Sequence, residues 1–269
     1  MRATGWTPPK ASDYARLKCA GPRAADILDN VVPADSADAE ALVMIVDQDG
    51  LGSCVANAVG QIIRAEQLRV GAPADYPFPS RMWIYTLALA ADGQQGQDVG
   101  TNICTAIDRA AQFGFCPENV WPYEVPFFGD EPPLDAHHYA SDQQTKKSLG
   151  YHEITETGNA RIEAMRKALT AGKLVAFGTP VTEAFCSEPL TGTVMRPSPS
   201  EPIAGGHAPV ACGYTVNPAT GRLEFRIANS WGEDWGERGF CWFDYGYLTW
   251  GQTSDLWIVG EVPMYSEVP

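Results

Sequence analysis

The stretch that decides the fold is Gln48–Val70, which reads QDGLGSCVANAVGQIIRAEQLRV. After Cys54, apolar side chains recur at helical spacing, and Gly71 stands where a left-handed helix cap belongs. Ser53 is a suitable N-cap, because its hydroxyl can accept a hydrogen bond from an amide of the first turn. The pattern therefore predicts a helix that begins at about Cys54 and buries a wide apolar face.

Cys54 allows two interpretations. A thiol in the first turn of a helix feels the positive end of the helix dipole, which favours the reactive thiolate. Most free cysteines, however, are small core residues without a chemical role. This stretch alone does not decide between a reactive and a structural cysteine.

The composition limits the partners that the chain can have. Its 269 residues suit one large domain or two lobes that share a cleft. With 33 acidic and 19 basic residues, the net charge is −14, which argues against nucleic acid and anionic membranes as main partners. No run of 18 apolar residues and no signal-peptide core is present, so the sequence predicts no membrane span and no signal-directed export.

The seven cysteines form an odd set without the pairing that zinc sites show. We therefore expect no metal and no cofactor. Reduced thiols are expected as well, which makes the cytoplasm the default location. A virion or non-classical export remains an alternative.

The hydrophobic pattern changes period along the chain. Helical spacing dominates to about residue 113, followed by a proline-rich connection over 117–150 and one more helix over 161–170. Five segments then read as strands: Leu174–Val181, Ala208–Tyr214, Leu223–Ala228, Gly239–Phe243 and Leu256–Val262. The sequence therefore predicts an α+β protein, with a helical lobe, a largely antiparallel sheet or barrel, and the working groups at their junction.

Only four histidines could act as a base. His137 and His138 fall in the proline-bordered connection and are expected in a solvated loop, and His152 is expected at the surface. His207, in GGHAPVACGY, begins a hydrophobic strand after two glycines, which would let another chain approach closely. His207 is therefore the candidate base, although a buried histidine of purely structural role has the same pattern.

A second pattern follows at Asn229–Gly236, which reads NSWGEDWG at the end of a predicted strand. A cysteine nucleophile needs a base, and the base needs a third group that fixes its tautomer. Cys54, His207 and Asn229 supply this set, and the Gln48 side-chain amide could join the Cys54 backbone N–H in an oxyanion hole.

Free energies show why the histidine is required. Lowering a thiol pKa from about 8.5 to about 4 corresponds to roughly 6 kcal/mol. A helix terminus contributes at most about 2 kcal/mol of that amount. The rest must come mainly from a nearby cation, and we expect that cation to be the imidazolium of His207.

At this point the sequence resembles the papain-like (C1) cysteine peptidases. The matching motifs are Gln48-x5-Cys54, Gly206-His207-Ala208, and Asn229-Ser230-Trp231-Gly232-x2-Trp235-Gly236, in the order of the family. Trp121-Pro122-Tyr123 and Asp98-Val99-Gly100 are similar to the bacterial and phage branch of that family.

The resemblance implies a peptidase domain over 31–269, with a helical lobe at about 47–125 and a barrel-like β lobe at about 150–269. Residues 1–30 would form an N-terminal leader or extension. It also implies hydrolysis of peptide or protein substrates through a thioacyl intermediate. The implied site residues are Cys54 (nucleophile), His207 (general base, then acid), Asn229 (orienting group), Gln48 (oxyanion donor), Trp231 (shield against water), and Val99, Gly100 and Gly206 (substrate binding).

Three positions depart from the family pattern, and two other functions stay open. Leu51 stands where the family has a cysteine, so that disulfide is absent, while Asp49 and Val55 replace a glycine and an aromatic residue. The first alternative is an inert papain-fold module, for example part of a larger phage assembly. The second is a transamidase or deamidase, because a thioacyl intermediate can also react with amines.

Overall fold

The computed structural model describes residues 3–17, 23–146, 149–187 and 192–265. Most helices precede most strands, which confirms the predicted α+β class. The helices are α1 (Ala11–Tyr14), α2 (Ala24–Leu28), α3 (Cys54–Arg69), α4 (Arg81–Ala91), α5 (Ile103–Phe113), α6 (Leu134–Lys146), α7 (Gly158–Thr170), α8 (Glu183–Cys186) and α9 (Tyr245–Leu248), with short 3-10 turns at Glu40–Leu42 and Val125–Phe127. The strands are β1 (Ala37–Asp38), β2 (Gly150–Glu153), β3 (Val175–Thr182), β4 (Thr193–Val194), β5 (Ile203–His207), β6 (Val210–Val216), β7 (Leu223–Ala228), β8 (Phe240–Asp244) and β9 (Ser254–Glu261).

The sheet is open rather than barrel-like. Its strands follow the order β2-β9-β3-β6-β7-β8-β4, with β1 added on β6 and β5 added on β3. These pairings are antiparallel except for the short β4–β8 pair. Among the described strands the order never returns to β2, so the expectation of a barrel-like lobe is corrected to an open, mostly antiparallel sheet.

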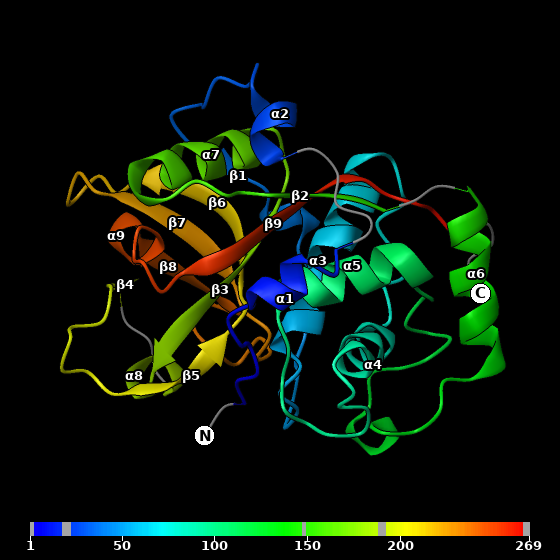
Figure 1. Cartoon of the computed structure of the whole chain (residues 1–269). Helices are drawn as coiled ribbons and strands as arrows, with labels where there is room; N and C mark the ends of the chain where they lie inside the picture. Colours follow the sequence, from blue (N-terminus) through cyan, green and yellow to red (C-terminus); the bar gives the residue numbers. More distant parts are fainter. Residues whose placement is uncertain (1–2, 18–22, 147–148, 188–191, 266–269) are drawn as a thin grey trace.

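Helix α3 lies at the centre of the molecule, between the sheet and the other helices (Figure 1). All of its residues from Cys54 to Gln67 are buried, including several polar side chains. Those side chains find partners in the surrounding loops. Gln61 bonds the backbone of Leu42 and Met44, and Arg64 bonds the carbonyl oxygens of Ala74 and Tyr76. Because most of its buried polar groups have such partners, α3 can be buried on every side; within the described residues the Gln67 Oε1 atom has none.

Two hydrophobic clusters flank the junction. One gathers around α3, α4 and α5 and includes Trp83, Tyr85 and Trp121. The other lies between α7 and the sheet and includes Phe177, Phe225 and Trp235. At the junction between the two clusters, α3 packs against β3, β6 and β9, which come from the second half of the chain.

Several local predictions were wrong. The 117–150 connection contains helix α6, so His137 and His138 lie on a helix, and the His137 ring packs edge-on against Trp83. His152 is buried in β2 rather than placed at the surface.

Among the described residues no cysteine is paired, and Cys19 lies outside them. None of the described helices combines the length and apolar character that a membrane span requires.

Candidate active site

Cys54 is the first residue of α3, as predicted, and Ser53 precedes it as N-cap. Ser53 does not cap with its hydroxyl, however. That hydroxyl is paired with the hydroxyl of Tyr123 and also accepts a bond from Asn57. The turn before the cysteine is fixed by Asp98, whose carboxylate accepts the Gly52 N–H at 2.9 Å. The two residues before Cys54 are thus held in place by side chains from other parts of the chain.

His207 and Asn229 form the second half of the site. His207 ends β5, and Asn229 directly follows β7. The Nε2 atom of His207 lies 2.6 Å from the Asn229 Oδ1 atom, which also accepts the backbone N–H of Ser230 at 2.8 Å. Within the described residues the other ring nitrogen, Nδ1, is buried and has no hydrogen-bond partner. One nitrogen is therefore anchored while the other remains available for proton transfer.

Aromatic rings enclose this histidine. The Trp231 ring lies over His207 with 4.5 Å between ring centroids, and Phe185 packs against both rings. Trp235 supports Trp231 edge-on from behind. Trp231, the predicted shield, is thus in ring contact with His207, the donor of the hydrogen bond to Asn229.

Gln48 lies between the two halves and is completely buried. Its Oε1 accepts from the Ser230 hydroxyl at 2.7 Å, and its backbone N–H donates to the Ser230 carbonyl oxygen at 2.8 Å. Its Nε2 donates to the carbonyl oxygen of Leu51 at 2.8 Å and to that of Ala3 at 3.2 Å. The side-chain amide is thus held rigidly, with its N–H groups on the side of the N-terminal residues.

An unexpected feature is that the chain fills its own site. Residues Ala3–Thr7, here called the blocking segment, run between β5 and the loop before α5 (Figure 1). The Gly206 carbonyl oxygen accepts the backbone N–H groups of Gly5 and Trp6, each at 3.0 Å. On the opposite side, Thr101 donates to the Gly5 carbonyl oxygen and accepts the Thr7 N–H. Trp6 and Thr101 thereby form an isolated parallel β-bridge.

Small residues make room for this segment. A methyl group on Gly100 would meet the carbonyl oxygen of Gly5, and one on Gly206 would meet the carbonyl oxygen of Trp6. Gly100 also has a φ angle of +74°, a left-handed backbone conformation that glycine adopts more readily than other residues. The predicted binding positions Gly100 and Gly206 thus contact backbone, here that of the blocking segment. Val99 is half exposed and lines an adjoining open pocket of about 640 Å³.

The blocking segment removes both reactive side chains from solvent, and the exposed fraction of Cys54 and His207 is 0%. Burial raises the pKa of Cys54 to about 11, although backbone N–H groups of Ala208, Gly5, Val55 and Trp6 act in the opposite direction. Burial likewise lowers the pKa of His207 to about 4, against a smaller opposing effect of the Asn229 hydrogen bond. Burial therefore disfavours the charged forms of both the thiol and the imidazole in the closed site.

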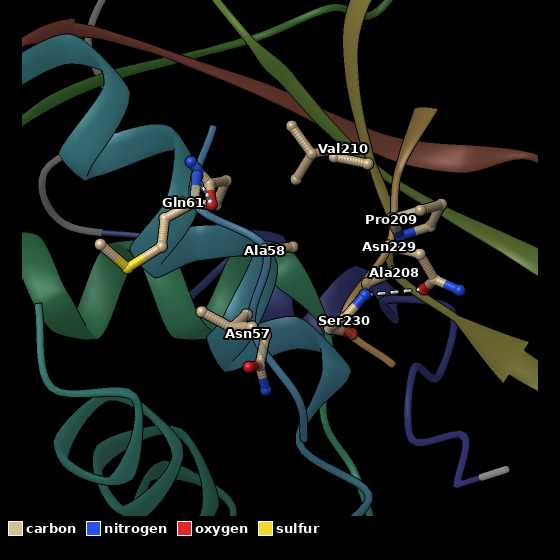
Figure 2. A pocket seen from close by; sticks show the side chains of 11 residues that line it. Asn57, Ala58, Gln61, Ala208, Pro209, Val210, Asn229 and Ser230 are labelled. Atoms are coloured by element: carbon tan, nitrogen blue, oxygen red, sulfur yellow. Dashed lines mark hydrogen bonds between the residues drawn. The ribbon is translucent and has the colours of Figure 1, made fainter. Parts of the chain in front are cut away.

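A small cavity lies behind the site, between α3 and the strands β6 and β7 (Figure 2). Its volume is about 10 Å³, and Ala58, Gln61, Val210 and Asn229 are among the residues that line it. A cavity of this size has room for about one water molecule. It therefore cannot be the substrate pocket.

Sequence reasoning missed the blocking segment and Asp255. The Trp6 side chain enters a buried pocket and its indole N–H donates to the Asp255 carboxylate at 3.0 Å. Nothing in the irregular first thirty residues indicated that Trp6 contacts the site.

The described residues contain no cluster of three or more His, Cys, Asp or Glu side chains placed to bind a metal ion.

Comparisons with known proteins agree with this geometry. The sequence model of the family described as "Papain family cysteine protease" matches residues 90–255, a stretch that includes His207 and Asn229 and begins after Gln48 and Cys54. An uncharacterized peptidase C1-like protein of Acanthamoeba polyphaga mimivirus is 34% identical over 224 residues, covering 81% of this chain and 70% of that protein.

Solved structures share the fold. Xylellain, a cysteine protease from Xylella fastidiosa, superimposes with a TM-score of 0.78 at 25% identity, covering 97% of each chain. Digestive procathepsin L 3 from the larval midgut of Tenebrio molitor superimposes with a TM-score of 0.66 at 19% identity, covering 91% of this chain and 73% of that one. With a family match over more than half of its length and a relative of this identity, the chain belongs to the papain family of cysteine peptidases.

Proposed function

We propose that this protein hydrolyses peptide bonds through a Cys54 thioacyl intermediate, and that the blocking segment keeps it inactive until the segment is displaced. The observation that carries the proposal is the 2.6 Å contact between His207 Nε2 and Asn229 Oδ1, which leaves the Nδ1 of the histidine for the thiol proton. The backbone of Ala208, the residue after that histidine, acts to lower the pKa of the Cys54 thiol.

The acylation step follows from these positions. In the open site His207 Nδ1 takes the proton of the Cys54 thiol, and the thiolate attacks the carbonyl carbon of the substrate. The negative oxygen that forms accepts hydrogen bonds from Gln48 Nε2 and the Cys54 backbone N–H. His207 then gives its proton to the leaving amine, the C–N bond breaks, and a thioester on Cys54 remains.

Deacylation repeats the proton transfers with water. His207 takes a proton from a water molecule, whose oxygen attacks the thioester carbonyl carbon. The C–S bond breaks, the carboxylic acid leaves, and the proton returns to the Cys54 sulfur. Asn229 keeps the imidazole in one orientation through both steps, and Trp231 keeps water away from their hydrogen bond.

The blocking segment is not placed as a substrate. The backbone N–H groups of Gly5 and Trp6 donate to the Gly206 carbonyl oxygen, and the Gly5 carbonyl oxygen accepts from Thr101 on the other side. A nucleophile needs a carbonyl carbon, so the thiol has no target at Gly5. Displacement of the segment would hydrate both side chains, remove the desolvation that separates their pKa values, and allow the thiolate–imidazolium pair to form.

The test is alkylation of Cys54 by iodoacetamide at about pH 6, read by mass spectrometry, in the unchanged chain and in Gly5→Ala. We expect slow labelling in the unchanged chain and labelling of Cys54 well ahead of the other cysteines in the variant. Hydrolysis of a peptide library by the variant, abolished by Cys54→Ala, would support peptidase action. Mass spectrometry of the products separates cleaved peptides from ligated or deamidated ones, and stable closure of both proteins would instead support an inert module.

A further inference from the structure

Tyr123 links the two stretches of backbone that carry the proposed oxyanion donors. Its hydroxyl donates to the carbonyl oxygen of Gln48 at 2.9 Å, and it is paired with the hydroxyl of Ser53, the residue before Cys54. We propose that Tyr123 is a positioning residue that holds the Gln48 side-chain amide and the Cys54 backbone N–H at the separation required by the negative oxygen. The inference rests on the proposed function, because the two groups act as donors to that oxygen only in the proposed reaction.

The direction of both hydrogen bonds follows from the groups that are present. A tyrosine hydroxyl carries one proton, and burial raises the pKa of Tyr123 to about 12, so this proton is retained at neutral and acidic pH. Because the proton is donated to the Gln48 carbonyl oxygen, the Ser53 hydroxyl donates to the Tyr123 oxygen. A continuous chain of hydrogen bonds therefore runs from Gln48 through Tyr123 to Ser53.

The peptide group between Ser53 and Cys54 is held by Asn57 as well. The Asn57 Nδ2 atom donates to the Ser53 carbonyl oxygen at 2.9 Å and to the Ser53 hydroxyl at 3.1 Å. A peptide group is planar, so a partner that fixes its carbonyl oxygen also fixes the direction of its N–H, which here belongs to Cys54. The Ser53 hydroxyl thus connects the plane of the Cys54 N–H to Tyr123.

Arg81 keeps this arrangement rigid. Its guanidinium carbon lies 4.1 Å from the centroid of the Tyr123 ring, and its Nη1 atom donates to Asn57 Oδ1 and to the Asp47 carbonyl oxygen, each at 2.9 Å. Two further bonds, of 2.8 and 2.7 Å, join it to the carboxylate of Glu118. Tyr123 and Arg81 are only 9% and 7% exposed, so close packing fixes both side chains. The Tyr123 hydroxyl is therefore in place before a substrate binds.

Loss of the Tyr123 hydroxyl would break the link but leave other contacts on both sides. Gln48 would keep its bonds to Ser230 and Leu51, and Ser53 would keep its bonds to Asn57. The separation of the two donors would then be less well defined, and a misplacement of about 1 Å can cost about 100-fold in rate. The thiol itself needs neither donor to react with an alkylating agent. Positioning of the donors thus predicts a loss of catalysis without a loss of thiol reactivity.

The first test is kinetic and uses the opened chain, Gly5→Ala. Tyr123→Phe in that background keeps the ring under Arg81 and removes only the hydroxyl. We expect kcat to fall about 10- to 100-fold with little change in KM, and alkylation of Cys54 by iodoacetamide to keep its rate. An unchanged kcat would overturn the inference. A fall in alkylation as large as the fall in kcat would overturn it too, because it would indicate a general disturbance around the cysteine.

Tyr214→Phe is the matched control. Tyr214 is also buried, and the guanidinium carbon of Arg166 lies 5.2 Å from its ring centroid. Its hydroxyl donates to the Ala34 carbonyl oxygen at 2.8 Å and is paired with the Thr170 hydroxyl at 2.8 Å. This set of contacts lies between α7, β6 and the segment before β1. Tyr214→Phe should therefore lose a similar amount of stability and keep its kcat.

Ser53→Ala breaks the same link from its other end and keeps the test valid if Tyr123→Phe fails to fold. It should show a similar loss of kcat in the Gly5→Ala background. The double variant with Tyr123→Phe should be no slower than the slower single variant, since one link is broken in all three proteins. Losses that multiply in the double variant would mean that the two hydroxyls act separately, which would overturn the inference.

Peptide aldehydes test the positioning without catalysis. The Cys54 thiolate adds to the aldehyde carbon, a C–S bond forms, the C=O double bond becomes single, and His207 returns the thiol proton to the oxygen. That oxygen lies where the two donors point. The probes are acetyl-dipeptide aldehydes and the matching alcohols, which form no bond to the thiol. Tyr123→Phe should weaken binding of the aldehydes about tenfold or more and leave binding of the alcohols unchanged.

The aldehydes also separate this inference from the proposed function. Selective loss of aldehyde binding in Tyr123→Phe, in a Gly5→Ala chain that cleaves no peptide, would leave the positioning role standing and overturn the peptidase function. Peptide cleavage combined with equal aldehyde binding by the two chains would overturn the positioning role and leave the peptidase function standing.

Discussion

Gly5 of the blocking segment and Gly52 of the loop before the cysteine are in such close contact that a methyl group on Gly5 would run into the carbonyl oxygen of Gly52. The two positions are far apart in the sequence, and their contact seals the site over Cys54. Closure therefore requires glycine at position 5, because a side chain there would collide with the backbone of Gly52.

The first prediction concerns this contact. Gly5→Ala should displace the blocking segment, because the backbone of Gly52 cannot move without disturbing the start of α3. Alkylation of Cys54 at pH 6 should then become at least about tenfold faster, as expected for loss of more than about 1.4 kcal/mol of closure. Gly50→Ala is the matched control, because a methyl group there meets no atom within 4 Å. Equal labelling rates in the two variants would contradict closure by this contact.

The second prediction concerns the His207–Asn229 pair. In the Gly5→Ala background, Asn229→Ala should lower kcat about 10- to 100-fold with little change in KM. The substitution removes a hydrogen bond of about 1.5–3 kcal/mol that orients the imidazole during the reaction. Steady-state kinetics on one peptide substrate measure the effect, and the exposed Asn30→Ala serves as control. An effect confined to KM would mean that Asn229 acts in binding rather than in positioning.

The third prediction concerns Gln48. Gln48→Ala, again in the open background, should lower kcat about 10²- to 10³-fold, because one donor to the negative oxygen is lost. Cys54 should still be alkylated at nearly the same rate, since alkylation forms no such oxygen. If labelling falls as much as kcat, the residue acts by holding the loop through Ser230 and Leu51 rather than as an oxyanion donor.

The fourth prediction concerns pH. In the closed chain the Cys54 pKa is raised from 9.0 to about 11 by burial, so the thiolate needed for alkylation becomes abundant only in strong base. Relative to the unfolded chain, in which the thiol keeps its ordinary pKa of 9.0, the raised pKa stabilises the closed fold below pH 9.0, and this contribution is lost as the pH rises through 11. Labelling of the unchanged chain should therefore climb steeply above pH 9. Cys54 of the Gly5→Ala chain should already be labelled rapidly near pH 6. If the labelling rates of the two proteins rose with pH in parallel, that result would argue against the proposed ion pair.

Much of this fold was readable from the sequence because the deciding patterns are local. Helix α3 was predicted from periodicity, and its start at Cys54 was predicted from Ser53. Strand β7 alternates strongly and was predicted with its observed bounds. Helix α6 was missed because its polar, histidine-containing sequence lies between prolines and has a weak apolar face.

The site was predicted in part for a different reason. Gln48, His207 and Asn229 lie in short motifs whose chemistry requires them to meet. In the structure His207 bonds to Asn229, and Gln48 bonds to Ser230, the residue after Asn229. The contact of Trp6 with Asp255 joins residues 249 positions apart and leaves no periodic signal. The shifts of the Cys54 and His207 pKa values could not be predicted either, because they depend on burial in the closed site.

The most direct test of the whole account is hydrolysis of a peptide library by the Gly5→Ala chain, with Gly5→Ala/Cys54→Ala as the matched protein. We predict that the first protein cleaves peptides, that the second does not, and that the unchanged chain is much slower than the first. Absence of cleavage by an opened chain whose Cys54 is readily alkylated would contradict the peptidase function. Equal cleavage by the two variants would contradict the role of Cys54.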